Sequence, residues 1–163
     1  MSDKIKVFID GNTGTTGIRI NERLRGRDDT LLFVLPEEKR RDPDARMEAI
    51  LGCDVAFLCL PDEVARETVL AADSMEADTI IIDTSTAHRI SPGWAYGFPE
   101  LGDVFVQKTK NSRRIAVPGC HASGFIALVY PLIEAGVLSK DALLSCFSLT
   151  GYSGGGKKMI AEY

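Results

Sequence analysis

The sequence is poor in the residues that mark several functional classes. Its 163 residues include only two histidines, one tryptophan and four cysteines, and the cysteines show neither close pairing nor metal-ligand spacing. We therefore expect reduced thiols, no metal site and a cytoplasmic protein. The net charge of −4 argues against nucleic acid as a partner, because duplex binding needs clustered, uncompensated Lys and Arg.

Long apolar runs are also missing. The longest, residues 125–133, is well short of the about 20 apolar residues that a membrane-spanning helix needs. The first residues, Met-Ser-Asp-Lys, do not have the pattern of a signal peptide. From these features we expect no association with a membrane.

What the sequence does contain is a series of short apolar segments that alternate with helical patterns. Strands are predicted at residues 4–10, 31–35, 55–60, 79–83 and 115–117, and helices at about 18–24, 44–51 and 63–73. This alternation favours parallel strands joined by right-handed crossovers, and hence a doubly wound, Rossmann-like α/β sheet. Residues 90–111 lack clear periodicity, so we expect a long loop there with an edge strand at 104–107.

A glycine-rich turn separates the first predicted strand from the first predicted helix. Its glycines lie three residues apart, which suits a tight turn, a close approach by a pyrophosphate, and close packing of the helix on the strand. The predicted cofactor-binding residues of this turn are Gly11, Thr13, Gly14, Thr15, Thr16 and Gly17. The alternative is an ordinary strand-to-helix turn with spare glycines.

Basic residues follow the second predicted strand, where NAD-binding domains usually carry an acidic residue. Lys39, Arg40 and Arg41 could hold a 2′-phosphate, which favours NADP(H) as the cofactor. The same residues, which are flanked by acidic ones, could equally form a solvated loop.

A second glycine-rich segment, residues 151–158, resembles the phosphate loop of nucleoside triphosphatases. That motif ends in Ser or Thr because the hydroxyl binds the metal that accompanies the triphosphate, whereas this segment ends in Lys158. We therefore set an ATPase or GTPase aside. We expect instead that Ser153, Gly154 and Gly155 approach the cofactor closely.

Cys120 is the candidate nucleophile. It follows a predicted strand and precedes an apolar helical pattern, so we expect it just before a helix N-terminus, where free N–H groups and the helix dipole stabilise a thiolate. Cys53, Cys59 and Cys146 lie in or beside apolar segments, where a thiol is normally a core residue. The alternative for Cys120 is likewise a buried structural thiol.

Neither histidine is assigned as the base for this thiol. His121 is next to Cys120, but neighbouring side chains in an extended segment point to opposite sides. His88 follows the strand that ends at Asp83, near the edge of a parallel sheet where ligands bind. Taken alone, each histidine is more typical of a polar loop residue than of a catalyst.

Five segments, in order along the chain, together resemble the N-acetyl-γ-glutamyl-phosphate reductases of the shorter-chain type. They are the turn at 11–17, Asp-Thr-Ser-Thr-Ala-His-Arg at 83–89, Tyr-Gly-Phe-Pro-Glu-Leu at 96–101, Pro-Gly-Cys at 118–120 and Gly-Tyr-Ser-Gly-Gly-Gly-Lys at 151–157. The resemblance implies an enzyme of arginine biosynthesis that makes N-acetylglutamate 5-semialdehyde. In this family the cysteine matching Cys120 expels phosphate from the acyl phosphate, and NADPH reduces the resulting thioester.

The resemblance also adds residues to the predicted site and sets the expected domain organisation. Ser85 joins the cofactor-binding residues, and Arg89 and His121 are candidates for substrate binding. For Arg89, a structural ion pair is the alternative to binding a phosphate or carboxylate. We expect an NADP-binding domain at residues 1–142 and the start of a truncated substrate and dimerisation domain at 143–163.

Members of the family continue into a substrate domain that supplies a catalytic histidine. The chain is therefore expected to be a fragment that binds NADP(H) weakly and is inactive alone. Its expected partners are an acyl-phosphate substrate and inorganic phosphate, and the full-length protein is expected to be a homo-oligomer. Two alternatives stay open: an enzyme like aspartate-semialdehyde dehydrogenase, and a nucleotide-binding module without catalysis.

Overall fold

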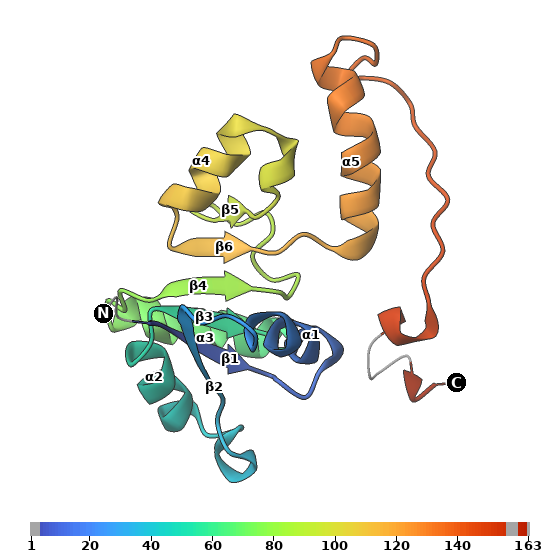
Figure 1. Cartoon of the computed structure of the whole chain (residues 1–163). Coiled ribbons are helices and arrows are strands. Elements are labelled where there is room, and N and C mark those ends of the chain that lie inside the picture. Colours follow the sequence, from blue (N-terminus) through green and yellow to red (C-terminus); the bar gives the residue numbers. More distant parts are fainter. Residues whose placement is uncertain (1–3, 156–159, 163) are drawn as a thin grey trace. The chain divides into compact units, whose positions relative to one another are not determined.

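The computed structural model describes residues 4–155 and 160–162, with the side chain of Ser153 excepted, and it divides into two compact units (Figure 1). The first unit comprises residues 1–118 and the second residues 119–163. Each unit is described by itself below. The domain boundary predicted at residue 143 stays a prediction.

The first unit is built on a parallel sheet of six strands in the order β2-β1-β3-β4-β6-β5. The strands are β1 (Ile5–Asp10), β2 (Thr30–Phe33), β3 (Val55–Leu58), β4 (Ile80–Asp83), β5 (Ala95–Tyr96) and β6 (Arg114–Ala116). The predicted doubly wound α/β fold is confirmed. The strand order reverses between β1 and β3, which is the place where open α/β sheets bind their ligands.

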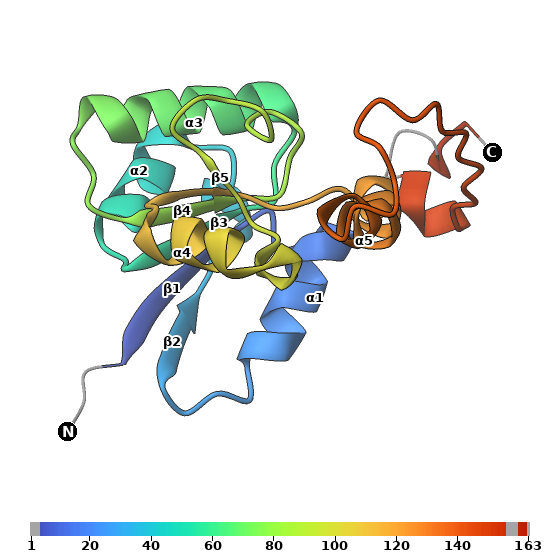
Figure 2. The ribbon, with the colours of Figure 1, turned by 90° about the horizontal axis from the view of Figure 1, so that it is seen from above.

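Helices cover both faces of this sheet. They are α1 (Thr15–Leu24), α2 (Pro43–Leu51), α3 (Asp62–Ser74) and α4 (Asp103–Asn111), with short 3₁₀ turns η1 (Glu37–Lys39) and η2 (Pro99–Leu101). Figure 2 shows α2 and α3 on one face and α1 and α4 on the other, as right-handed crossovers from this strand order require. The central strands are continuous apolar runs because both of their faces are covered.

The core of the first unit lies between the sheet and the pair α2 and α3. Phe8, Ile50, Leu58 and Ile81 are completely buried there. The predicted strand at 31–35 is an edge strand, and its Leu31 is exposed rather than buried. An apolar run therefore indicated a strand correctly here, but it did not indicate how deeply that strand is covered.

The predicted edge strand at 104–107 is wrong, because these residues belong to α4. The sequence Val-Phe-Val has high strand propensity, but Phe105, Val106 and Thr109 are half-buried at helical spacing while Val104 is exposed. Asp103 in the first turn and lysines in the last turn also suit the helix dipole. The strand at that edge of the sheet is instead β5, and β2 lies at the other edge.

The second unit consists of α5 (Cys120–Glu134), a segment without helix or strand at 142–151, and the 3₁₀ turn η3 (Tyr152–Gly155). Pro131 lies within the last turn of α5, and the helix continues past it to Glu134. None of the residues of α5 is buried. No helix in the described part of the chain is long and apolar enough to cross a membrane.

Candidate functional site

Four strands of the first unit end in one row at the carboxyl edge of the sheet. Asp10 of β1 is in register with Leu58 of β3, which is in register with Asp83 of β4, and Asp83 with Ala116 of β6. The glycine turn, the Cys59–Pro61 connection and the 84–89 segment all leave from this row. The fold therefore brings the glycine turn, Ser85 and Arg89 to the same edge.

The glycine turn has the conformation that its spacing predicts. Gly11 has a φ of +77°, and a Cβ there would lie 2.1 Å from the carbonyl oxygen of Cys59. A Cβ on Gly17 would lie 2.4 Å from the carbonyl oxygen of Gly11, so α1 packs directly on the turn. A Cβ on Gly14, the N-cap of α1, would make only an ordinary contact, 3.5 Å from the carbonyl oxygen of Gly11. The two tight contacts at Gly11 and Gly17 match the roles assigned to the first and third glycines.

The first turn of α1 is free to receive an anion. No side chain caps the helix, and no acidic residue lies in its first turn. Thr13, Thr15 and Thr16 are exposed beside it. The unpaired N–H groups and hydroxyls at this point match the donors that a pyrophosphate requires.

A buried ion pair lies beside this turn, and no local pattern in the sequence predicts it. Arg46 of α2 donates from Nε to Oδ2 of Asp10 at 2.5 Å, and both side chains are almost completely buried. Arg46 also donates from Nη2 to the carbonyl oxygen of Arg40 at 3.1 Å. The pair connects the end of β1 to the basic segment at residues 37–42, which contains η1.

A second buried carboxylate, Asp83, organises the segment after β4. Asp83 accepts hydrogen bonds from the N–H and hydroxyl of Ser85, at 2.9 and 2.7 Å, and its Oδ2 lies 2.7 Å from Nδ1 of His88. The His88 ring stacks on Trp94 with centroids 4.1 Å apart. His88 is thus a buried, oriented residue rather than a solvated loop histidine.

Arg89 holds the same segment against β6. Its Nε donates to the carbonyl oxygen of Val117 at 3.0 Å, and its Nη2 to that of Thr84 at 3.3 Å. Thr86 makes two hydrogen bonds to the Asp62 carboxylate, one from its N–H at 3.0 Å and one from its hydroxyl. The bond from the hydroxyl lowers the pKa of the Asp62 carboxyl. Through its two bonds Arg89 connects the 84–89 segment to Val117, just after β6. A role of Arg89 in binding substrate stays a prediction.

The cysteines of the first unit are structural, as predicted. Burial raises the pKa of the Cys53 thiol to about 11, and burial also raises that of Cys59 to about 11. Cys59 lies against the turn at Gly11, and its N–H donates to the carbonyl oxygen of Asp10 at 2.9 Å. Both thiols therefore remain protonated, and poor nucleophiles, near neutral pH.

Cys120 lies in the second unit, where it is exposed as the first residue of α5, one position further in than predicted. The N-cap Gly119 provides no side-chain cap to the helix, so the N–H groups of the first turn face the region of the thiol. His121 places Nδ1 in contact with the hydroxyl of Ser148. Cys146, predicted as a core residue, is exposed. Its apolar neighbours in sequence do not cover it.

The remaining predicted residues lie around η3. The N–H of Gly154 donates to the carbonyl oxygen of Gly151 at 2.9 Å, and Gly155 ends the turn. The side chain of Ser153 and the predicted Gly156 to Lys158 part of the motif lie outside the described residues. Contact of this turn with a cofactor stays a prediction.

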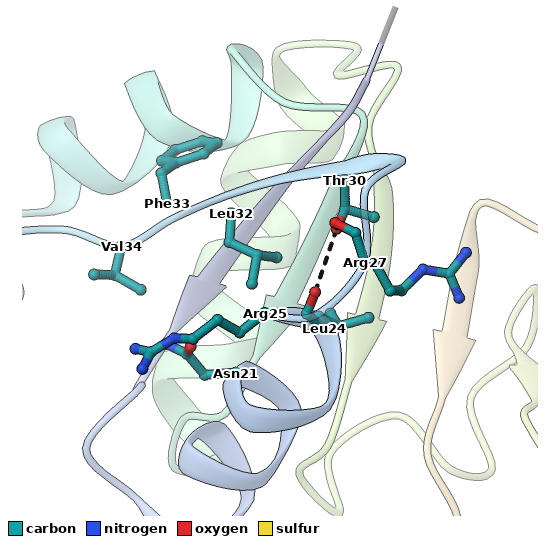
Figure 3. Close-up of a pocket in the computed structure, with 8 residues that line it drawn as sticks. All are labelled: Asn21, Leu24, Arg25, Arg27, Thr30, Leu32, Phe33 and Val34. Atoms are coloured by element: carbon teal, nitrogen blue, oxygen red, sulfur yellow. Dashed lines mark hydrogen bonds between the residues drawn. The ribbon is translucent and has the colours of Figure 1, made fainter. Parts of the chain in front are cut away.

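A separate hollow of about 340 Å³ opens between the end of α1 and β2 (Figure 3). Leu32 and Val34 line it from the strand side, and Asn21 and Arg25 from the helix side. Its lining includes no cysteine, histidine or carboxylate. Within the described residues, no group of His, Cys, Asp or Glu is arranged to hold a metal ion. The chemistry of the first unit is therefore concentrated at the carboxyl edge of the sheet.

Comparison with known proteins gives three findings. A model of the semialdehyde dehydrogenase NAD-binding domain matches residues 33–108. N-acetyl-gamma-glutamyl-phosphate reductase 2 of Pseudomonas putida is 47% identical over 96% of this chain and 50% of its own length. The N-acetyl-gamma-glutamyl-phosphate reductase of Chelativorans sp. is 48% identical over 97% of this chain and 50% of its own length. The chain thus spans about half the length of these curated relatives, and the resemblance inferred from its motifs is confirmed.

Solved structures agree with the fold. Aspartate semialdehyde dehydrogenase from Francisella tularensis superposes with a TM-score of 0.66 at 16% identity, covering 81% of this chain and 41% of that one. The Candida albicans enzyme, solved with NADP, gives a TM-score of 0.60 at 18% identity, covering 82% and 48%. At such low identity the likeness establishes the fold alone.

Proposed function

We propose that this chain, which is homologous over nearly its whole length to about half of the N-acetyl-γ-glutamyl-phosphate reductases, is the cofactor-binding and thiol-bearing part of such an enzyme. The proposed reaction is the NADPH-dependent reductive dephosphorylation of N-acetyl-γ-glutamyl phosphate to N-acetylglutamate 5-semialdehyde. The observation that carries the proposal is the identity of 46–48% with the curated reductases together with an exposed cysteine at a helix N-terminus.

The proposed cofactor site is the carboxyl edge of the first unit. The turn from Gly11 to Gly17 would hold the pyrophosphate on the free N–H groups of α1, with the hydroxyls of Thr13, Thr15 and Thr16 around it. The absence of a side-chain cap and of acidic residues in the first turn of α1 supports this fit. NADPH, when bound, supplies the hydride for the reduction. The basic residues at 39–41 are proposed to receive the 2′-phosphate, which favours NADP(H) over NAD(H).

Cys120 is the proposed nucleophile. Its thiolate would attack the acyl-phosphate carbonyl carbon, and the carbon–oxygen bond to phosphate would break, which releases inorganic phosphate and leaves a thioester on Sγ. After reduction, the carbon–sulfur bond breaks and the thiolate is restored as the aldehyde leaves. The free N–H groups of the first turn of α5 support this role, because they favour negative charge on sulfur.

The 84–89 segment is proposed to shape the remainder of the site. Ser85 is held by Asp83 with its backbone at the carboxyl edge, which suits contact with the cofactor. Arg89 donates to carbonyl oxygens in the hydrogen bonds above, and, besides the Thr86 hydroxyl bond, its charge helps to lower the pKa of the nearby Asp62 carboxyl; we propose that it binds phosphate in addition to this role as a tether. His121 is proposed to contact substrate from the second unit, and Ser153 to Gly155 to approach the cofactor.

The match covers about half of the relatives' length, and the acid and base groups of the reaction are proposed to come from the part outside it. We further propose that the enzyme is cytoplasmic and is a homo-oligomer when both halves are present. No observation favours the aspartate-semialdehyde alternative, because the likeness to those structures is one of fold.

The decisive experiment combines binding with turnover. The purified chain should bind NADP⁺, measured by calorimetry, and should show no phosphate-dependent reduction of NADP⁺ with N-acetylglutamate semialdehyde. Addition of a polypeptide that corresponds to the other half of the relatives should restore this activity, and should fail to do so for Cys120→Ser. Activity with aspartate semialdehyde in place of the acetylated aldehyde would overturn the substrate assignment.

A further inference from the structure

We propose that Arg46 is a positioning residue that sets the basic turn, residues 39–41, at a fixed place relative to the glycine turn. In this way Arg46 would determine how strongly the site prefers a 2′-phosphorylated adenosine. The inference rests on the proposed cofactor site. It extends that proposal by assigning the preference for a 2′-phosphate to a buried residue as well as to the surface cations.

Arg46 connects the two segments through its single guanidinium. Nε donates to Oδ2 of Asp10, the residue before Gly11, and Nη2 donates to the carbonyl oxygen of Arg40 within the basic turn. Arg46 is only 8% exposed and Asp10 only 4%, so solvent does not compete appreciably with either bond. A movement of the basic turn relative to β1 would break at least one of these two bonds.

The basic turn is otherwise held by local contacts. Lys39 donates from its N–H to the carbonyl oxygen of Pro36 at 3.0 Å, and Asp42 to that of Lys39 at 3.1 Å. The side chain of Asp42 caps α2 by accepting from the N–H groups of Asp44 and Ala45. None of these bonds reaches β1. The connection through Arg46 therefore fixes the turn relative to the pyrophosphate position.

The turn also contains a donor without a partner. Nε of Arg40 is buried and has no hydrogen-bond partner within the described part of the chain. A buried donor of this kind is normally satisfied by protein, water or ligand. The guanidinium of Arg40 therefore has hydrogen-bonding capacity that the contacts within the turn leave unused.

Arginine is required for this task because its planar fork serves two acceptors in one geometry, whereas a lysine ammonium is a compact charge. The covalent frame of adenosine 2′,5′-bisphosphate fixes the separation of its two phosphates. The two anion positions must therefore keep their relation to within about 0.5 Å for both to bind well. A ligand with the 5′-phosphate alone does not depend on that relation.

The test uses the full chain and two simple probes, adenosine 2′,5′-bisphosphate and 5′-AMP, with affinities measured by calorimetry. Arg46→Lys should weaken binding of the bisphosphate by about tenfold, the size of one charge-assisted hydrogen-bonded contact, and binding of 5′-AMP by less than about twofold. Arg113→Lys, the same substitution just before the amino end of β6, should alter neither affinity. The readout is the ratio of the two affinities, which a general loss of structure would not change.

Each remaining outcome contradicts either the inference about Arg46 or the proposed cofactor site. If Arg46→Lys weakens both probes in parallel, Arg46 is merely structural and the inference is overturned. If the wild-type chain binds both probes and the ratio is unchanged in the variant, the inference fails while the proposed cofactor site stands. If the wild-type chain binds neither probe, the proposed cofactor site fails and the inference falls with it.

A second variant guards against loss of folding. Asp10→Asn keeps the shape of the side chain and an acceptor oxygen for Arg46, and it should lower the same ratio by a smaller factor. Hydrogen exchange should accelerate at the N–H of Asp42 in both variants, while that of Ile50 within α2 stays slow. An unchanged ratio with unchanged exchange at Asp42 would overturn the inference.

Discussion

The two compact units differ in how completely they bury their apolar side chains. The first unit buries Phe8, Ile50, Leu58 and Ile81 completely. In the second unit, by contrast, Leu128 of α5 is 74% exposed and Phe147 is 87% exposed. The first unit is thus stabilised by its own core, whereas the second carries apolar side chains that its described residues leave uncovered.

This contrast separates the two parts of the proposed chemistry. The glycine turn and the 84–89 segment belong to a unit with a continuous core, with the buried Arg46–Asp10 ion pair, and with a buried contact between Asp83 and His88. The candidate nucleophile Cys120 begins the helix of the other unit, where none of the helical residues is buried. We therefore expect cofactor binding to tolerate disruption of the second unit better than thiol chemistry tolerates it.

The largest expected effect concerns the buried ion pair of the first unit. Arg46→Met should lower the free energy of unfolding by about 3–5 kcal/mol, because it leaves the Asp10 carboxylate buried without a partner. Arg113→Met removes an exposed pair with Asp78 and should cost less than about 1 kcal/mol. Urea unfolding followed by the fluorescence of Trp94, the chain's only tryptophan, measures both. Equal losses would show that burial of the pair is unimportant.

Core truncation should discriminate between the two units directly. Ile50→Ala, at a fully buried position, should cost about 2–5 kcal/mol through lost contacts and the cavity that remains. Leu128→Ala, at an exposed position of α5, should change stability by no more than about 0.5 kcal/mol. Calorimetric unfolding of the two variants provides the measurement. A large cost at Leu128 would mean that α5 is covered in solution, and would remove the contrast.

Thiol reactivity offers a third comparison. Burial raises the pKa of Cys53 and Cys59 to about 11, so both stay protonated near neutral pH and their thiolate forms increase only as pH rises towards that value. Each pKa unit changes the thiolate fraction tenfold, so the rise from the ordinary thiol value of 9.0 to about 11 lowers the thiolate fractions of Cys53 and Cys59 about a hundredfold. Iodoacetamide should therefore label the exposed Cys120 faster than either. Peptide mass spectrometry at several pH values gives the rates.

The outcome for Cys146 sharpens this result. It is exposed like Cys120 but does not begin a helix, so slower labelling of Cys146 isolates the effect of the helix N-terminus. Labelling of Cys120 that is no faster than that of Cys146 would contradict an activated thiolate.

The smallest effect is expected at the start of α2. Asp42→Ala removes the cap that accepts from the N–H groups of Asp44 and Ala45, at a cost of about 1 kcal/mol in unfolding free energy. Asp42→Asn should restore most of the stability, because asparagine caps helices as well as aspartate does. If the two variants are equally destabilised, the charge at residue 42 matters more than the cap.

Most elements of the first unit were predictable from the sequence because they depend on local patterns. Apolar runs bounded by Gly, Pro and Asp predicted β1, β3 and β4, and the flanking residues predicted α2 with its C-terminal Gly52. Residues 103–111 were not predictable in this way. Their strand propensity was overridden by packing of Phe105 and Val106 in a helix.

The sequence by itself determined the glycine turn and the place of Cys120 at the start of a helix. Both follow from the order of residues over a few positions, where backbone freedom and helix periodicity act. Only the tertiary structure decided that Arg46 reaches Asp10, and that His88 lies between Asp83 and Trp94. These contacts join residues from separate elements, and burial makes them strong. No local pattern specifies which charged side chains a folded sheet brings together.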